Sequence, residues 1–385
     1  MILLLILFWA SVFVIFWANI GYPVSIIILG KIIKRKNKKV KNYEPTVTIM
    51  IVAHNEEKVI KAKLENVLKV DYPKEKLEIV VSSDNSTDST NDIVETFIKK
   101  HKKNNIRLFK VKKRKGKTNA QNEAAKTIKS EIIVMTDANA MLDRSAVKEL
   151  VSSFDKNVAY VTGRLIYSNS KDSLTSNTEN TYWDLDTKIR DIESRIQTIT
   201  AGNGAIYACK KSEYHDFRSI ECHDSSMPLY YALNGKRAIA NHNAIAYEKA
   251  GENDKDEFKR KIRMSRTILR AMLPSVKILN ILKYKWYTYF YLGHRTFRYS
   301  LWLSHIVLLI TNILLIKYSL FYTIPLAIQL IIYLIAVLKY LFRINNGIIN
   351  YISYYCMTVL AQFIGVLKII ARKNKPFWEK AESTR

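Results

Sequence analysis

The chain has 385 residues, enough for one large domain together with membrane segments. Its 61 Lys and Arg against 34 Asp and Glu give a formal net charge of +27. This balance favours anionic partners such as a phosphorylated substrate, acidic lipid headgroups or nucleic acid. The three cysteines form no CxxC pair and no metal-ligand spacing, which argues against a zinc site and for a reducing compartment.

The N-terminal 33 residues are almost wholly apolar and carry no charged side chain before Lys31. This run is long enough to span a bilayer and too long for a secretory signal peptide. Residues 1–33 are therefore predicted to form a transmembrane helix, with a break or kink near Gly21 and Pro23. The basic linker that follows, residues 34–44, favours the cytoplasm by the positive-inside rule and can also contact anionic lipid.

Residues 45–276 alternate between strand and helix signals and are predicted to form one cytoplasmic domain. Unbroken apolar runs typical of strands in a parallel sheet occur at 46–53, 77–83, 106–111 and 131–137. Helical segments separate them, and this order predicts an α/β fold with a doubly wound, mostly parallel sheet. Further along the domain we expect a strand at 158–165, a helix at 174–197, two short strands within 237–247 and a basic helix at 257–266.

Acidic residues lie at or just after the ends of three of these strands, namely Glu56, Asp84 and Asp137. The carboxyl ends of parallel strands share one edge of the sheet, where ligands bind in open α/β folds. Asn139 follows Asp137 at i+2, and two such oxygen ligands suit magnesium or manganese. The alternative for this stretch is an ordinary Asp-rich turn.

The strand ends together indicate a nucleotide pocket, with Asp84 directed to a base or ribose and a metal at Asp137 directed to phosphates. Lys117 follows the Gly116 turn at the start of a helix, where it could also meet phosphate. The rest of the basic run 112–117 is interpreted as a solvated surface.

The second half of the domain offers three further candidates. Two glycines at 202 and 204 permit either close approach of a ligand to the backbone or a tight turn. Asp224 lies near the start of a helix, where a helix cap is the alternative role. Arg260, Arg263 and Arg266 recur every three residues, which favours either a pyrophosphate clamp or a solvated or lipid-facing helix.

The C-terminal part is again apolar. Residues 277–299 mix aromatic and basic side chains, as interfacial segments do, and residues 300–371 are predicted to form transmembrane helices. The polar tail 372–385 begins with basic residues that prefer the cytoplasm, so the number of spans stays open. The expected location is the cell membrane, as a multi-pass protein.

Taken together, these residues resemble the family 2 glycosyltransferases, in particular the membrane-embedded branch of hyaluronan, chitin, cellulose and poly-N-acetylglucosamine synthases and bacterial exopolysaccharide or capsule transferases. The resemblance covers about residues 46–272. Its motifs are Val52-Ala-His-Asn-Glu-Glu57, Ser83-Asp-Asn-Ser-Thr-Asp88, Thr136-Asp-Ala-Asn139, Cys222-His-Asp224 and Arg260-Lys-Ile-Arg263-Met264. In the same order, they correspond to five elements of the family. These are its opening strand-to-loop motif, its Asp-Gly-Ser-Thr-Asp signature, its metal-binding Asp-x-Asp, its acidic element that ends in the catalytic base, and its Gln-x-x-Arg-Trp motif.

The resemblance implies a GT-A fold and an inverting transfer of sugar from a nucleotide diphosphate sugar, most simply a UDP-sugar. It implies Asp224 as general base, Asp137 as the second catalytic residue, and magnesium or manganese at Asp137 and Asn139. The residues expected to bind the nucleotide sugar are Ala53, Asn55, Glu56, Asp84, Lys117, Asp137, Arg260 and Arg263. The residues expected to bind the acceptor are Gly202, Asn203, Gly204 and His223.

Two departures from the family pattern matter. Asn139 replaces an Asp and is a weaker cation ligand, and the last motif lacks its Gln and Trp, which leaves processive synthesis open. The acceptor is therefore either a growing polysaccharide or a polyprenyl-phosphate or other lipid-linked sugar. A non-catalytic scaffold is a further alternative, and a homo-oligomer is possible. No nucleic-acid partner is expected, because no basic-aromatic recognition module is present.

Overall fold

The computed structural model describes residues 1–40, 42–168, 174–249, 254–272 and 275–377, with the backbone alone for 174–183. The chain forms two compact units, each built from three stretches of sequence. We call residues 1–32, 170–184 and 251–374 the helical unit, and residues 33–169, 185–250 and 375–385 the sheet unit. The basic helix expected at 257–266 clusters with the helical unit.

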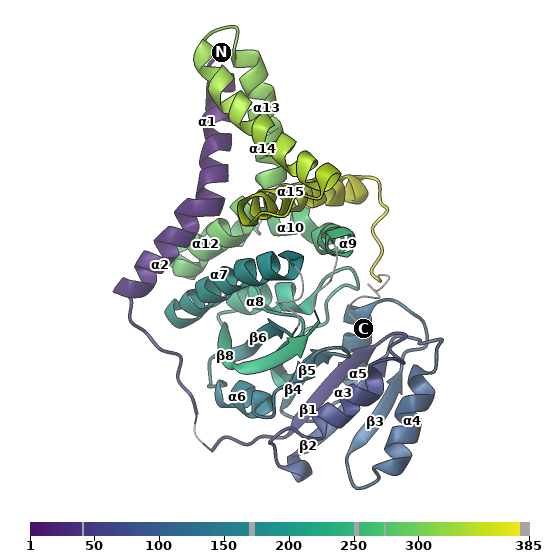
Figure 1. Cartoon of the computed structure of the whole chain (residues 1–385). Helices are drawn as coiled ribbons and strands as arrows, with labels where there is room; N and C mark the ends of the chain where they lie inside the picture. The colour runs from purple at the N-terminus through teal and green to yellow at the C-terminus, as the bar shows by residue number, and fades with distance from the viewer. Residues whose placement is uncertain (41, 169–173, 250–253, 273–274, 378–385) are drawn as a thin grey trace. The chain divides into compact units, whose positions relative to one another are not determined.

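The sheet unit contains an eight-stranded sheet with the order β3-β2-β1-β4-β7-β6-β8-β5 among the described residues. Its strands are β1 (Val47–Ala53), β2 (Leu77–Ser83), β3 (Ile106–Lys110), β4 (Ile132–Asp137), β5 (Met141–Leu142), β6 (Val158–Tyr167), β7 (Ile206–Lys210) and β8 (Arg237–Glu248). Strands β3, β2, β1 and β4 are parallel neighbours. This confirms the first four expected strands and the shared edge at their carboxyl ends (Figure 1).

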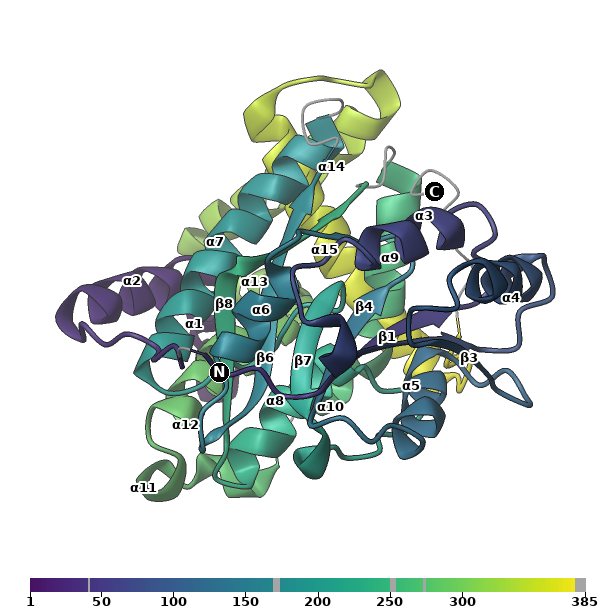
Figure 2. The same ribbon diagram turned by 90° about the horizontal axis from the view of Figure 1, so that it is seen from below.

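The rest of the sheet is mixed. Strand β7 runs antiparallel between β4 and β6, as Figure 2 shows from below, and β8 is parallel to β6 but antiparallel to β5. The expectation of two short strands within 237–247 was wrong, because β8 is continuous. The polar stretch Asn241–Asn243 lies instead at a register shift, where Thr162 pairs with Ala240 and Arg164 with Ile245.

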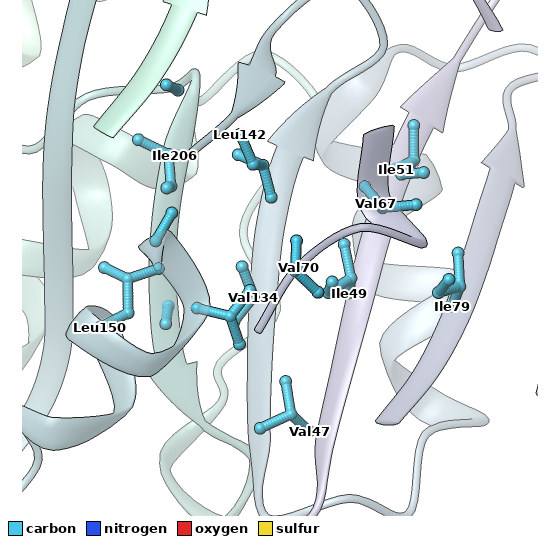
Figure 3. Packing of buried hydrophobic residues seen from close by; sticks show 14 of the residues in the cluster. Val47, Ile49, Ile51, Val67, Val70, Ile79, Val134, Leu142, Leu150 and Ile206 are labelled. Carbon is cyan, nitrogen blue, oxygen red and sulfur yellow. The ribbon is translucent and has the colours of Figure 1, made fainter. Parts of the chain in front are cut away.

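Helices cover both faces of the sheet, which explains the unbroken apolar run of β1. Ile49 and Ile51 face one core with α3 (Ile60–Val67), α4 (Thr90–Lys100) and α6 (Ala146–Ser152). Met50 and Val52 face the other with α5 (Lys117–Lys126) and α8 (His223–Leu233). Figure 3 shows the first core, in which Ile49 of β1, Val134 of β4 and Val67 of α3 lie together.

The helical unit begins with α1 (Ile2–Phe16) and α2 (Tyr22–Ile32), joined by a π-helical turn at Trp17–Gly21, close to the expected kink. Its other α-helices are α9 (Asp254–Met264), α10 (Ile268–Met272), α11 (Ile281–Tyr284), α12 (Trp286–Tyr291), α13 (Leu301–Leu315), α14 (Thr323–Phe342) and α15 (Gly347–Ile370). Helix α7 (Leu174–Ile196), close to the expected 174–197, belongs partly to each unit.

Three described helices are long and apolar enough to cross a membrane: Ile2–Ile32, Leu320–Phe342 and Gly347–Ile370. A fourth candidate consists of Trp286–Phe297 and Leu301–Leu315, bent by 60°. Within this unit Phe8 of α1 packs with Leu308 and Leu315 of α13.

Candidate active site

The loops that follow β1 and β2 are tied to each other. Asp84 donates its backbone N–H to the Ala53 carbonyl at 2.8 Å, and the Asn55 Oδ1 accepts the Thr87 N–H at 2.8 Å. The backbone of Asn55 has a φ of 55°, the left-handed region that Asn tolerates better than most residues. Ala53, Asn55 and Asp84 thus lie together, and the Asn55 amide oxygen is used to hold the two loops.

Asp84 also anchors the basic loop of residues 112–116. Its carboxylate accepts the N–H of Lys115 at 3.1 Å and that of Gly116 at 2.8 Å, and only 3% of the residue is exposed. Gly116 has a φ of +97°, which favours glycine, and it stands at the N-cap of α5. Asp84 therefore helps to fix the direction in which Lys117 leaves the loop, while its contact with a base or ribose stays a prediction.

The C-terminal tail of the same unit touches this loop. A Cβ atom on Gly116 would lie 2.5 Å from the Pro376 carbonyl oxygen, so only glycine fits there without a shift. The Arg114 guanidinium lies over the Phe377 ring, 4.5 Å from its centroid. Nothing in the residue pattern predicted this contact between segments more than 250 residues apart in the chain.

Lys117 is the centre of the candidate site. Its ammonium forms an ion pair with Asp137 and donates to the Gly204 carbonyl at 3.3 Å. A Cβ on Gly204 would lie 3.7 Å from this ammonium and 3.5 Å from Asp224 Oδ2. Burial opposes the ammonium, but the negative charges of Asp137 and then Asp224 outweigh it and raise the pKa of Lys117 above its ordinary value.

Asp224 occupies the second position of α8 and is not the cap of the helix. The N-cap residue is Cys222, and no side chain caps this helix end. The Asp224 backbone carbonyl accepts the Gly202 N–H at 2.6 Å, which draws the segment 202–204 to its side. The helix-cap alternative for Asp224 is therefore wrong, and its carboxylate faces the Lys117 and Gly204 side of the site.

The segment 202–204 is held by protein groups on several sides. Arg190, paired with Asp186 at 2.6 Å, donates to the Gly202 carbonyl at 2.6 Å. A Cβ on Gly202 would lie 1.9 Å from the Tyr160 hydroxyl oxygen, so the close approach that requires glycine here is made by Tyr160. Asn203 uses its Oδ1 to accept the Ala205 N–H at 2.9 Å. Contact of this segment with an acceptor stays a prediction.

His223 is a core residue rather than a surface group. It is 1% exposed, and its Nε2 lies 3.0 Å from the Asn122 Oδ1, to which it donates. Burial, with a smaller effect of the Lys117 charge, lowers the pKa of His223 to about 3. The imidazole is therefore neutral at physiological pH, and its burial does not favour direct contact with an acceptor.

The two residues expected to hold a metal differ in their surroundings. Asp137 pairs with Lys117, and 32% of its side chain is exposed. Asn139 instead has an acidic neighbour, because its Nδ2 donates to Glu248 Oε1 at 2.5 Å. Among the described residues no three His, Cys, Asp or Glu side chains gather as a metal site. Asp137 and the Asn139 Oδ1 are nevertheless oxygen donors of the kind that magnesium and manganese prefer, and they fit a cation shared with substrate phosphates.

Lys63 is a site residue that sequence reasoning missed. It is fully buried on α3 and donates to Thr136 Oγ1 at 2.9 Å and to the Ala140 carbonyl. Lys63 therefore bonds to both ends of the turn 136–140. Burial lowers the pKa of Lys63 to about 7, against the opposing charges of Asp137 and Glu248. Its position on the apolar face of α3, between Ile60 and Leu64, was a signal that could have revealed it.

Arg260 and Arg263 lie on α9 in the helical unit. The Arg260 guanidinium donates to the buried Glu257 carboxylate at 2.6 and 3.0 Å. The Arg260 charge therefore neutralises a carboxylate of its own helix, and contact of either arginine with a pyrophosphate stays a prediction.

Comparison with known protein families agrees with this geometry. Residues 48–214 match the family model described as glycosyl transferase family 2, and residues 132–336, over half of the chain, match the glycosyl transferase family group 2. The chain is a family 2 glycosyltransferase. The resemblance drawn from its motifs is thereby confirmed.

Curated relatives of this glycosyltransferase match over part of their length. It is 35% identical to the probable glycosyltransferase YdaM of Bacillus subtilis over 133 residues, which are 34% of this chain and 32% of that protein. It is 27% identical to the poly-beta-1,6-N-acetyl-D-glucosamine synthase of Staphylococcus epidermidis over 172 residues, 44% of this chain and 40% of that protein. The chain thus spans 32% and 40% of the length of these two relatives.

The fold of this glycosyltransferase also has a solved counterpart. The mannosyltransferase PcManGT from Pyrobaculum calidifontis, in complex with GDP-Man and Mn²⁺, superimposes with a TM-score of 0.72 over 96% of this chain and 100% of that chain. The two sequences are 19% identical, so this likeness establishes the GT-A fold alone.

Proposed function

We propose that this protein is a membrane-bound, inverting glycosyltransferase that moves a sugar from a nucleoside diphosphate sugar to an acceptor hydroxyl. The observation that carries the proposal is that Lys117, which pairs with Asp137, meets Asp224 beside Gly204. A carboxylate that can hold a cation, a partly buried ammonium and a second carboxylate are groups that suit a transfer from a diphosphate.

In the proposed reaction, Asp224 takes the proton of the acceptor hydroxyl while the acceptor oxygen forms its bond to the anomeric carbon. The bond from that carbon to the diphosphate breaks, and its electron pair leaves with the phosphate oxygen. Lys117 carries a positive charge beside the departing diphosphate and stabilises it. A single base and direct displacement invert the anomeric centre, in contrast to retaining enzymes with a carboxylate nucleophile.

A divalent cation, magnesium or manganese, would be held by Asp137 and Asn139 together with the diphosphate, and it would supply further charge neutralisation. Ala53, Asn55, Glu56 and Asp84 lie in or beside the paired loops that would shape the nucleotide side of the site. The donor is a UDP-sugar or, as in the structure of the mannosyltransferase neighbour, a GDP-sugar.

For the acceptor, we propose a sugar hydroxyl of a polysaccharide or of a lipid-linked sugar. The proteins named as relatives include a poly-N-acetylglucosamine synthase, a beta-monoglucosyldiacylglycerol synthase and a dolichyl-phosphate-linked sugar transferase. The three candidate spans suit either acceptor, because both are met at a membrane. We place the sheet unit on the cytoplasmic side on account of the basic linker 34–44.

The test is donor turnover by the full chain purified in detergent. UDP-sugars and GDP-mannose would be supplied with Mn²⁺, Mg²⁺ or a chelator, and with oligosaccharide or polyprenyl-phosphate-sugar acceptors. We expect metal-dependent release of one nucleoside diphosphate and a product of inverted anomeric configuration. A long product identifies a polysaccharide synthase, and a single added sugar on lipid identifies the second acceptor class. A product that retains the donor configuration would contradict the assignment of Asp224.

A further inference from the structure

We propose that Glu248 is a positioning residue for the cation site, and that it supplies beside Asn139 the negative charge that this amide lacks. The inference rests on the proposed function, because it concerns the same cation. Neither the family motifs nor the spacing of acidic residues pointed to Glu248, which lies 109 residues from Asn139 in the sequence.

The backbone brings Glu248 to the site from another strand. It is the last residue of β8, and its carbonyl accepts the Ser168 N–H at 2.9 Å. The residue before it, Tyr247, pairs with Met141 at the start of β5, two residues after Asn139. The end of β8 is therefore fixed against the turn 136–140, on rigid strands rather than on a free loop.

The side-chain contact sets the orientation of the amide. Asn139 Nδ2 donates to Glu248 Oε1 at 2.5 Å, so the Asn139 Oδ1 is turned away from Glu248. An Asn side chain alone could present either its oxygen or its nitrogen to a cation. With Glu248 holding the nitrogen, only the oxygen remains for the metal side.

The charges of the site give Glu248 a second effect. Two lysine amino groups contact the turn: the buried Lys63 bonds to Thr136 and Ala140, and the partly buried Lys117 pairs with Asp137. The Lys63 ammonium is within electrostatic range of both Asp137 and Glu248. The Glu248 charge offsets part of this positive charge, so its loss would raise the electrostatic cost of bringing a divalent cation to the turn.

The experiment moves this charge from one residue to the other. Mn²⁺ binding to the full chain in detergent would be measured from the electron paramagnetic resonance signal of free Mn²⁺, with UDP and in parallel with GDP. E248Q keeps the size of the side chain and removes its charge. N139D/E248Q restores the charge at position 139 and keeps a hydrogen bond between the two side chains.

We expect E248Q to weaken Mn²⁺ binding about tenfold, the lower end of the range for outer-shell partners of a metal. N139D/E248Q should bind Mn²⁺ as the parent does. E123Q is the matched control, because Glu123 is an exposed partner of Lys126 on α5 and its loss changes the net charge equally. E123Q should leave Mn²⁺ affinity unchanged.

Three results would overturn the inference. Unchanged Mn²⁺ affinity in E248Q would remove Glu248 from this role and leave the proposed function intact. An N139D/E248Q variant that binds Mn²⁺ as weakly as E248Q would have the same two consequences. A parent protein that binds no Mn²⁺ with either nucleotide would overturn the cation site itself. Thermal melting of each variant, recorded alongside, separates a lost charge from a lost fold.

Discussion

The carboxylate of Asp224 and the ammonium of Lys117 both lie within 4 Å of the position that a Cβ on Gly204 would take, so the proposed base and the proposed phosphate-binding cation are close neighbours. This arrangement gives each side chain a separate task. The proposed base can accept the acceptor proton only as a carboxylate.

The first prediction concerns this base. Asp224→Asn keeps the shape of the side chain and removes its ability to accept a proton. We expect turnover to fall about 10²- to 10⁴-fold, while the affinity for UDP or GDP measured by calorimetry stays within error of the parent. Retained turnover would show that another group takes the proton.

His223 provides a prediction on pH. The folded protein holds its pKa at about 3, against an ordinary value of 6.5. Below pH 6.5 the unfolded chain therefore binds a proton at this residue before the folded protein does. The stability contributed by the neutral imidazole is complete above pH 6.5 and is lost progressively as the pH falls toward 3.

The melting temperature of the solubilised protein should therefore fall between pH 7 and pH 5, and part of that fall should belong to His223. His223→Gln keeps a donor for Asn122 and cannot titrate. Its melting temperature should depend less steeply on pH over this interval. Equal slopes for parent and variant would show that His223 takes up no proton on unfolding.

At the scale of elements, the segment 202–204 offers a matched pair of substitutions. Gly202→Ala would place a Cβ 1.9 Å from the Tyr160 hydroxyl oxygen, and we expect it to destabilise the protein by about 1–3 kcal/mol. Gly204→Ala meets Asp224 and Lys117 only at 3.5 and 3.7 Å and should leave the melting temperature nearly unchanged. Equal melting temperatures for the two variants would contradict this distinction.

The elements also show what the sequence could and could not predict. The strands that end at Ala53, Ser83 and Asp137 were foreseeable, because continuous apolar runs with a carboxylate beyond them are typical of a covered parallel sheet. Local patterns carry no information on pairing across long separations. For this reason the antiparallel insertion of β7 and the arrival of Glu248 beside Asn139 were not foreseen.

Individual roles were harder to predict than positions. Asp84 is expected to meet a nucleotide, and its carboxylate also accepts the N–H groups of Lys115 and Gly116, which no motif indicated. His223 was expected to meet an acceptor and lies in the core. In both cases the residue lies near the site as expected, but its partners depend on packing that no motif records.

At the scale of the whole molecule, the contact between the C-terminal segment and the loop 112–116 yields a further prediction. The chain changes units between residues 374 and 375, and Pro376 and Phe377 then pack on the loop 112–116. A chain that stops after Asn374 loses this contact. We expect trypsin to cut this shortened chain after the basic residues of the loop 112–116 faster than it cuts the full chain. Mass spectrometry of the solubilised protein would follow the cleavage.

The matched control stops after Phe377 and keeps both contacts. It should be cleaved in the loop at the rate of the parent. If both truncated chains were cleaved equally fast, the protection of the loop would not come from Pro376 and Phe377.

The same contact has a consequence for biosynthesis. All eight described strands have been translated once the ribosome has passed Glu248, so the sheet can close early. The 128 residues from 249 to 376, which include two of the apolar helices, must still be made before Pro376 can reach Gly116. At about 5–20 residues per second this takes roughly 6–25 s. A nascent chain therefore passes through a period in which its sheet can already be closed while the loop beside Lys117 still lacks the contact with Pro376 and Phe377.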